Sequence, residues 1–187
     1  MLFCDEIASV IRTLKQGGTI IYPTDTIWGI GCDPFNDAAV GNLFYLKKRP
    51  QSKPILLLVD SIEMLKQYVT IHPRVETLLV YHKQPLTLIY KADKRIPEHL
   101  TPEARTIGIR VVLDDFCKQV IQRFGKPISS TSANFSGSPF PSSFQDIEHN
   151  FLQVADYVVK HRQQEISKGK PSVIASFDSE GELSFFR

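Results

Sequence analysis

The chain has 187 residues, of which 42% are apolar, and its formal net charge at pH 7 is +2. This is the composition of an ordinary globular protein, so we expect one α/β domain over residues 1–187. No apolar run approaches the ~18 residues of a membrane span, and the small net charge does not favour strong nucleic-acid binding by the molecule as a whole.

The N-terminus and the cysteines favour a cytoplasmic protein. Residues 1–6 lack a basic stretch followed by an apolar one, so no signal peptide is expected. Three cysteines, Cys4, Cys32 and Cys117, lie far apart and form no C-x-x-C pair. We therefore expect them to be free thiols in a reducing compartment. The five histidines show no metal-ligand spacing, so no tightly bound metal is expected.

Helical and strand patterns alternate along the first half of the chain. Apolar residues at helical spacing predict a first helix around residues 7–14, ended by Gly17-Gly18. Asp60 and Glu63 have the spacing of a capping box. Further helices are predicted at residues 36–48, 60–69 and 73–81, and strands at 19–22 and 55–59.

The second half continues the alternation. Strands are predicted at residues 86–90, 107–112, 154–159, 172–177 and 183–186, and helices at 114–124 and 144–151. Gly125 follows the first of these helices, as expected at a helix C-terminus. Because strands and helices are mixed along the chain, we expect a mixed β-sheet surrounded by helices.

The first segment whose residues could form a ligand site is 22–31, Tyr-Pro-Thr-Asp-Thr-Ile-Trp-Gly-Ile-Gly. They follow a predicted strand and offer hydroxyls, a carboxylate and glycines, and ligand sites in α/β sheets commonly lie beyond strand ends. By composition alone, a turn whose Thr and Asp side chains bond their own backbone is the favoured interpretation.

Residues 47–54, Lys-Lys-Arg-Pro-Gln-Ser-Lys-Pro, form the second segment, with four positive charges within seven residues. Such donors suit a triphosphate, because arginine can bind two oxygens at once. Cations at a helix C-terminus are also stabilising by themselves, by ~0.3–1 kcal/mol each, which is the competing explanation. The two prolines fix the loop and favour the anion site slightly.

Residues 127–137, Pro-Ile-Ser-Ser-Thr-Ser-Ala-Asn-Phe-Ser-Gly, form the third segment. Its small and hydroxyl-bearing side chains can donate to phosphate or carboxylate oxygens. Composition alone favours a polar surface loop. No G-x-S-x-G elbow is present, so no nucleophilic serine is predicted.

Five motifs together resemble the YrdC family. They are residues 23–31, 47–50, 108–111, 130–137 and 170–174, which occur in the family's order and span nearly the whole chain. The resemblance implies a twisted, mostly mixed β-sheet with surrounding helices and a concave basic face. It also implies an L-threonylcarbamoyladenylate synthase, a nucleotidyltransferase that uses ATP, L-threonine and bicarbonate, with Mg²⁺ accompanying ATP. A separate tRNA-modifying transferase would then use the product.

The resemblance also implies roles for individual residues. The implied ligands of ATP are Lys47, Arg49, Lys53, Thr106, Ser132, Asn134 and Arg187. The implied contacts of threonine are Thr26, Arg110, Ser130 and Ser172, with Arg110 paired to the carboxylate. No certain catalytic side chain is implied, because in-line attack at phosphorus needs positioning and charge neutralisation more than a protein nucleophile.

Some positions depart from the family pattern and leave alternatives open. Leu58 stands where some members carry a histidine that contacts threonine, and Trp28 stands where tyrosine is commoner. The chain ends at Phe186-Arg187, so the additional C-terminal domain of longer members is not expected. The alternatives are a YciO-type paralogue with another acceptor, an RNA-binding protein that uses the same basic cleft, and a purely structural partner subunit.

Overall fold

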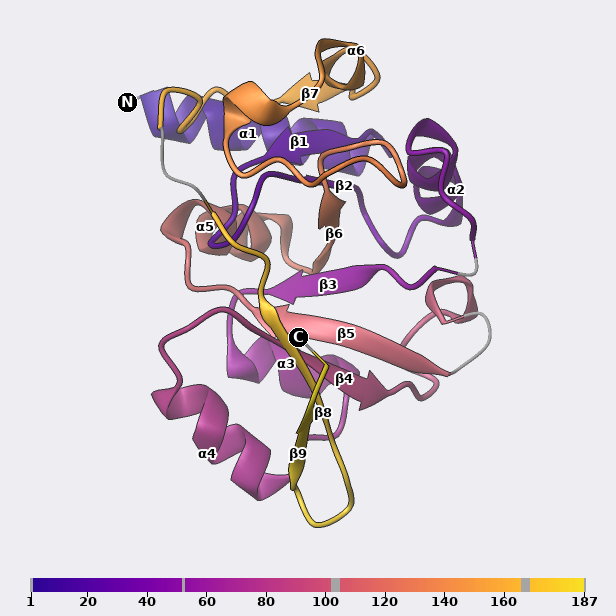
Figure 1. Cartoon of the computed structure of the whole chain (residues 1–187), viewed down its shortest axis with the longest axis vertical. Helices are drawn as coiled ribbons and strands as arrows, with labels where there is room; N and C mark the ends of the chain where they lie inside the picture. Colours follow the sequence, from indigo (N-terminus) through magenta and orange to yellow (C-terminus); the bar gives the residue numbers. More distant parts are fainter. Residues whose placement is uncertain (1, 52, 102–104, 166–168, 187) are drawn as a thin grey trace.

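The centre of the structure is one large mixed β-sheet, shown in Figure 1 by a computed structural model that describes residues 2–51, 53–101, 105–165 and 169–186. Nine described strands lie in the order β7-β1-β2-β6-β3-β5-β4-β8-β9. Their bounds are β1 Ile20–Tyr22, β2 Gly29–Gly31, β3 Leu56–Val59, β4 Leu86–Lys91, β5 Thr106–Val111, β6 Ile128–Ser132, β7 Tyr157–Val158, β8 Val173–Phe177 and β9 Leu183–Phe185.

This sheet contains both parallel and antiparallel pairs of strands. β3 pairs with β5, β4 with β8, and β1 with β7 in parallel. The remaining neighbours, including β2 with β6 and β6 with β3, are antiparallel. The predicted mixed sheet with surrounding helices is therefore confirmed.

Helices cover both faces of the sheet. The described helices are α1 Leu2–Lys15, α2 Asp37–Leu46, α3 Ile62–Tyr68, α4 Pro73–Tyr81, α5 Asp115–Phe124 and α6 His149–Leu152, with 3₁₀ turns η1 Glu98–Leu100 and η2 Phe144–Asp146. Residues of α2, α3 and α4 belong to the larger apolar core, and residues of α1 and α5 to a second core. None of the described helices is long and apolar enough to cross a membrane.

The alternation of side chains along β3 places the candidate site. Leu57 and Val59 belong to the larger core, whereas Leu58 belongs to the core beneath α1 and α5. Leu56 projects to the same face as Leu58, because side chains of a strand alternate, and it lines an open cavity. The cavity therefore lies beside α1 and α5 on one face of the sheet.

The predicted helix ends are largely confirmed. The side chain of Asp114 accepts from the backbone of Cys117 at the start of α5, and Gly125 ends that helix in the left-handed region at φ 82°. The predicted cap at Asp60 is wrong, because Ser61 caps α3 instead. The predicted helix at residues 144–151 is also wrong in its continuity, since it divides into η2 and α6.

Two strands were not predicted, because they lie in segments that were interpreted as loops. β2 is Gly-Ile-Gly and β6 is rich in serine, so neither shows the apolar alternation that predicts a strand. Both lie inside the sheet, paired with each other. Close approach explains Gly31, where an added Cβ would lie 1.9 Å from the carbonyl oxygen of Ser129.

Candidate active site

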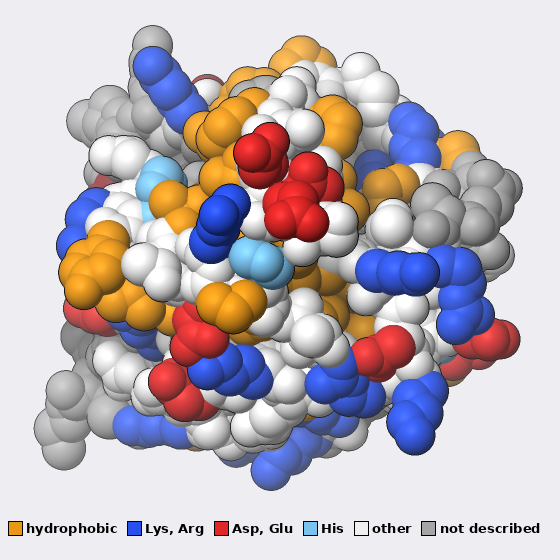
Figure 2. Space-filling model, turned by 90° about the horizontal axis from the view of Figure 1, so that it is seen from below, with side chains coloured by type: hydrophobic (Ala, Val, Ile, Leu, Met, Phe, Trp, Pro, Cys, Tyr) orange, Lys and Arg blue, Asp and Glu red, His pale blue; other side chains and the backbone are white. Residues whose placement is uncertain are grey.

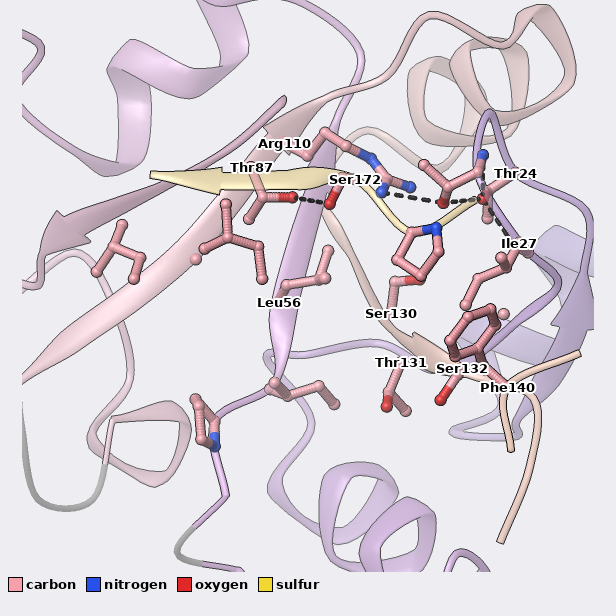
Figure 3. Close-up of a pocket in the computed structure, with 18 of the residues that line it drawn as sticks. Thr24, Ile27, Leu56, Thr87, Arg110, Ser130, Thr131, Ser132, Phe140 and Ser172 are labelled. Carbon is pink, nitrogen blue, oxygen red and sulfur yellow. Dashed lines mark hydrogen bonds between the residues drawn. The ribbon is translucent and has the colours of Figure 1, made fainter. Parts of the chain in front are cut away.

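A cavity of about 400 Å³ opens on the sheet face, where residues from all three chemically notable segments meet (Figure 3). Its hydroxyl-bearing lining residues are Thr24, Thr26, Thr87, Thr106, Ser130, Thr131, Ser132 and Ser172. Its charged lining residues are Arg49 and Arg110. The apolar lining residues are Ile27, Pro54, Ile55, Leu56, Ile89, Phe140, Pro171 and Ile174. The cavity is therefore suited to a ligand that carries both anionic and apolar groups.

Strand register brings the lining residues together. Thr106, Gly108 and Arg110 alternate along β5 and all face the cavity, as alternate residues of one strand must. Arg110 pairs in register with Thr87 of β4 on one side and with Leu58 of β3 on the other. The cavity floor is thus a row of cross-strand neighbours drawn from distant parts of the sequence.

Arg110 is the buried cation of this floor. Its Nη2 lies 2.9 Å from Oδ1 of Asp25, and the two side chains are only 3% and 7% exposed. The other carboxylate oxygen of Asp25 accepts the backbone N–H of Leu113, which holds the carboxylate in place. The Nε of Arg110 is buried and has no hydrogen-bond partner among the described residues. The contacts with Asp25 and Thr26 use only part of the five N–H donors of the guanidinium, and Arg110 lines the cavity.

Two threonines connect Arg110 to the first loop. Arg110 Nη1 donates to the hydroxyl of Thr26 at 3.1 Å, and that hydroxyl lies 2.9 Å from the hydroxyl of Thr24. Thr24 in turn donates to the carbonyl of Ile27 at 2.8 Å. The loop that follows β1 is therefore a hydrogen-bonded turn and a wall of the cavity at once.

A second pair of hydroxyls lies close to Arg110 in Figure 3. Thr87 Oγ1 and Ser172 Oγ are 2.8 Å apart, although the two residues are 85 positions apart in the sequence. Both residues are buried. Ser172 is predicted to contact the threonine substrate. It lines the cavity together with its hydrogen-bond partner Thr87.

Lys47 does not line the cavity. Its Nζ donates to the carbonyls of Ser132 and Asn134 at 2.5 and 2.6 Å, and the side chain is 1% exposed. The same Nζ lies 5.4 Å from the ring centroid of Phe151. Because the side chain is buried and outside the cavity lining, Lys47 supports Ser132 from behind in this structure.

Burial, and to a lesser extent Arg49, lowers the pKa of Lys47 from 10.5 to about 7. Between these two values the unfolded chain binds a proton that the folded chain does not, so stability rises as the pH rises through this window. We expect the unfolding free energy of the wild type, minus that of Lys47→Met, to increase from pH 7 to pH 10. Denaturant unfolding of both proteins measures it, and a difference independent of pH contradicts it.

The other predicted ligands are spread in and around the cavity. Arg49 lines it, donates from Nη2 to the carbonyl of Pro54 at 2.8 Å, and has a buried Nε without a partner among the described residues. Lys53 is exposed and lies outside the lining. Asn134 is buried and donates from Nδ2 to Phe135 and Ser138, so it shapes the serine-bearing loop. Arg187 lies outside the described residues.

The structure therefore brings most of the predicted site residues together. Those that line the cavity are Thr26, Arg49, Thr106, Arg110, Ser130, Ser132 and Ser172. Four further polar groups were missed, namely Thr24, Asp25, Thr87 and Thr131. Thr24 and Asp25 lie inside residues 22–31, and both residue types are common in turns, so the sequence favoured a structural role for them. Thr87 lies within the predicted strand 86–90, and a polar residue among apolar ones was the sequence signal that could have indicated it.

Leu58, the position that departs from the family pattern, is fully buried in the core beneath α1 and α5. It is the register neighbour of Arg110 but does not line the cavity. The side of Arg110 that faces β3 is therefore backed by an aliphatic side chain, which cannot hydrogen-bond to a ligand.

The donor set does not fit a metal ion that the protein itself holds. Among the described residues, no group of three or more His, Cys, Asp or Glu side chains is placed to bind one. The described cavity lining contains hydroxyls and arginines but no carboxylate. Because Mg²⁺ is usually bound by carboxylates together with substrate phosphates, a magnesium ion here would depend on the phosphates.

Positive charge on the face seen in Figure 2 is not concentrated in a single stripe. Figure 2 shows lysines and arginines interspersed with aspartates and glutamates on the face seen there. A nucleic-acid interface is usually a continuous basic patch or stripe. This face therefore gives no support to RNA binding.

The mixed sheet and its cavity of arginines and hydroxyls define an α/β protein with a cavity suited to a small anionic ligand. The Sua5/YciO/YrdC family model, described as "Telomere recombination", matches residues 12–187, and the chain belongs to this family. A threonylcarbamoyl-AMP synthase of Pseudoalteromonas translucida is 36% identical over 157 residues, covering 82% of this chain and 84% of the relative. One of Vibrio parahaemolyticus is 34% identical over 177 residues, covering 91% and 93%. The expected family is thus confirmed, and these relatives are named as enzymes.

Solved structures confirm the fold. A variant of P. abyssi Sua5 superposes with a TM-score of 0.87 at 24% identity, covering 97% of this chain. E. coli YciO superposes with a TM-score of 0.83 at 23% identity, covering 97% of this chain and 87% of that one. This chain spans about half of the P. abyssi Sua5 chain, 52% of its length. The Sua5 and YciO structures are thus similar to this fold to a comparable degree.

Proposed function

We propose that this protein is an L-threonylcarbamoyladenylate synthase. L-Threonine and bicarbonate would form a carbamate, whose oxygen attacks the α-phosphate of ATP; pyrophosphate leaves and threonylcarbamoyl-AMP forms. The observation that carries the proposal is the cavity itself, which is lined by two arginines and by hydroxyl-bearing side chains from several strands and loops. Guanidinium and hydroxyl donors suit carboxylate and phosphate oxygens, so an anionic ligand is expected there. The names of the relatives and a P. abyssi Sua5 structure with L-threonine support the choice of substrate.

The roles divide between two ends of the cavity. Arg110 would bind the threonine carboxylate, with Thr26, Ser130 and Ser172 beside it. Arg49 would bind ATP phosphates together with Lys53, Thr106 and Ser132, and Arg187 would join them from the chain end. Lys47 and Asn134 would contribute from behind Ser132. Fixed donors of this kind lower the barrier by positioning the reactants and by stabilising charge that develops at phosphorus.

Several finer parts belong to the same proposal. Mg²⁺ would enter with the phosphates of ATP and help neutralise their charge. The product would pass to a separate tRNA-modifying transferase, and both proteins would work in the cytoplasm. Residues 1–187 would act as a single domain.

The decisive experiment measures pyrophosphate release from ATP and Mg²⁺, with L-threonine and bicarbonate added separately and together. Mass detection of the adenylate identifies the product. The proposal expects release only when both are present, and little release with other amino acids. Equal release without threonine would falsify it. Nucleotide turnover that needs another acceptor instead identifies a YciO-type paralogue.

Arg49→Ala tests the phosphate end of the cavity. A hydrogen bond to a charged group contributes about 1.5–3 kcal/mol, so its loss should weaken ATP binding by about tenfold or more. Lys48→Ala is the matched control, because it removes a neighbouring exposed charge that does not line the cavity. Calorimetric titration with ATP measures both. Equal ATP affinity in the two variants contradicts the role of Arg49.

A further inference from the structure

The hydrogen bonds of the Thr24 and Thr26 hydroxyls form a chain that Figure 3 shows between Arg110 and Ile27. Thr24 Oγ1 lies 2.8 Å from the carbonyl of Ile27, 3.0 Å from the backbone nitrogen of Thr26 and 2.9 Å from Thr26 Oγ1. Thr26 Oγ1 also lies 3.1 Å from Arg110 Nη1. Thr24 is buried, whereas Thr26 is partly exposed at the cavity.

The direction of each bond follows from counting protons. A hydroxyl has one proton and two acceptor lone pairs. The carbonyl of Ile27 can only accept, so the single proton of Thr24 is used there. Both lone pairs of Thr24 then accept, one from the backbone N–H and one from the hydroxyl of Thr26. The proton of Thr26 is therefore directed to Thr24 and away from the cavity.

One lone pair of Thr26 is left after this count. Its first lone pair accepts from Arg110, which cannot act as an acceptor. Its second lone pair is free, so the hydroxyl can accept a hydrogen bond from a ligand but cannot donate one. A carboxylate or phosphate oxygen at this point would meet a lone pair, whereas an N–H group would be bound.

We propose that Thr24 is a positioning residue that fixes Thr26 as a hydrogen-bond acceptor, so that Thr26 recognises the α-nitrogen of the amino-acid substrate. This inference rests on the proposed function, in which Arg110 binds the α-carboxylate. The α-nitrogen is attached to the same carbon as that carboxylate, and it keeps an N–H both in the free amino acid and in its carbamate. Thr24 would therefore determine which end of the substrate lies against the first loop.

The test compares L-threonine with 3-hydroxybutanoate, which keeps the carboxylate and the hydroxyl but lacks the amine. Calorimetric titration gives the preference of the wild type for threonine over this analogue. Thr24→Val keeps the shape of the side chain and removes the acceptor, so the proton of Thr26 can turn toward the cavity. We expect this preference to fall by about tenfold in Thr24→Val and to be retained in Thr24→Ser.

ATP affinity and melting temperature serve as controls for damage to the fold. A purely structural role of Thr24 would weaken the binding of threonine and of 3-hydroxybutanoate equally, so the preference between them would not change. Thr26→Val removes the acceptor itself and should lose the same preference, which keeps the test valid if Thr24→Val does not fold. An unchanged preference in the folded valine variants overturns the inference. If the wild type itself binds no threonine, the proposed function fails and this inference fails with it; loss of the inference alone leaves threonine-dependent activity intact.

Discussion

Arg110→Ala is expected to lower the free energy of unfolding by roughly 3–5 kcal/mol, because it leaves the buried carboxylate of Asp25 without its partner. The two side chains are 3% and 7% exposed, so the carboxylate of Asp25 is shielded from bulk water and depends on the guanidinium for charge compensation. The same change removes the proposed ligand of the substrate carboxylate, and threonine binding should be lost. Unfolding in denaturant, followed by the fluorescence of the buried Trp28, measures the first effect, and calorimetry measures the second.

A double variant separates the two effects of Arg110. Asp25→Leu combined with Arg110→Met replaces the buried ion pair by apolar side chains, which is often neutral or stabilising. We expect this variant to recover most of the lost stability but not to bind threonine. Recovery of threonine binding would exclude Arg110 as the carboxylate ligand. An Arg110→Ala variant as stable as the wild type would show that the pair adds nothing to the fold.

Gly31→Ala is the second change with a large expected effect. The new Cβ would lie 1.9 Å from the backbone oxygen of Ser129, far inside van der Waals contact, so β2 and β6 must separate. Overpacking of this kind typically costs about 1–3 kcal/mol, and a backbone neighbour that cannot rotate away places this position at the upper end or beyond. Because β6 carries Ser130 and Ser132, the separation should also reduce any activity of the cavity.

Gly41→Ala is the matched control for this prediction. Gly41 lies within α2, and an added Cβ there meets no atom within 4 Å. Alanine in a helix interior stabilises a protein relative to glycine by roughly 0.5–1 kcal/mol. This variant should therefore unfold at a higher denaturant concentration than the wild type. Two Gly→Ala changes of opposite sign in one denaturation series would establish that close strand approach requires Gly31. Equal stability of both variants would contradict it.

The sequence by itself determined the local elements and most of the membership of the site. The caps of α5 at Asp114 and Gly125 depend on residues a few positions away, so their pattern is readable along the chain. The order of the motifs was sufficient to identify the family and to select Thr26, Arg49, Arg110 and the serines at the cavity. These residue types reveal their chemistry wherever the fold places them.

Only the tertiary structure decided how those residues act on one another. Asp25 and Arg110 form their pair, and Lys47 reaches the carbonyls of Ser132 and Asn134, across 85 or more sequence positions. β2 and β6 became strands because their neighbours in the sheet satisfy their backbone groups, although their own residues do not favour a strand. Burial, hydrogen-bond direction and charge compensation arise from such long-range contacts, and no local pattern of residues encodes them.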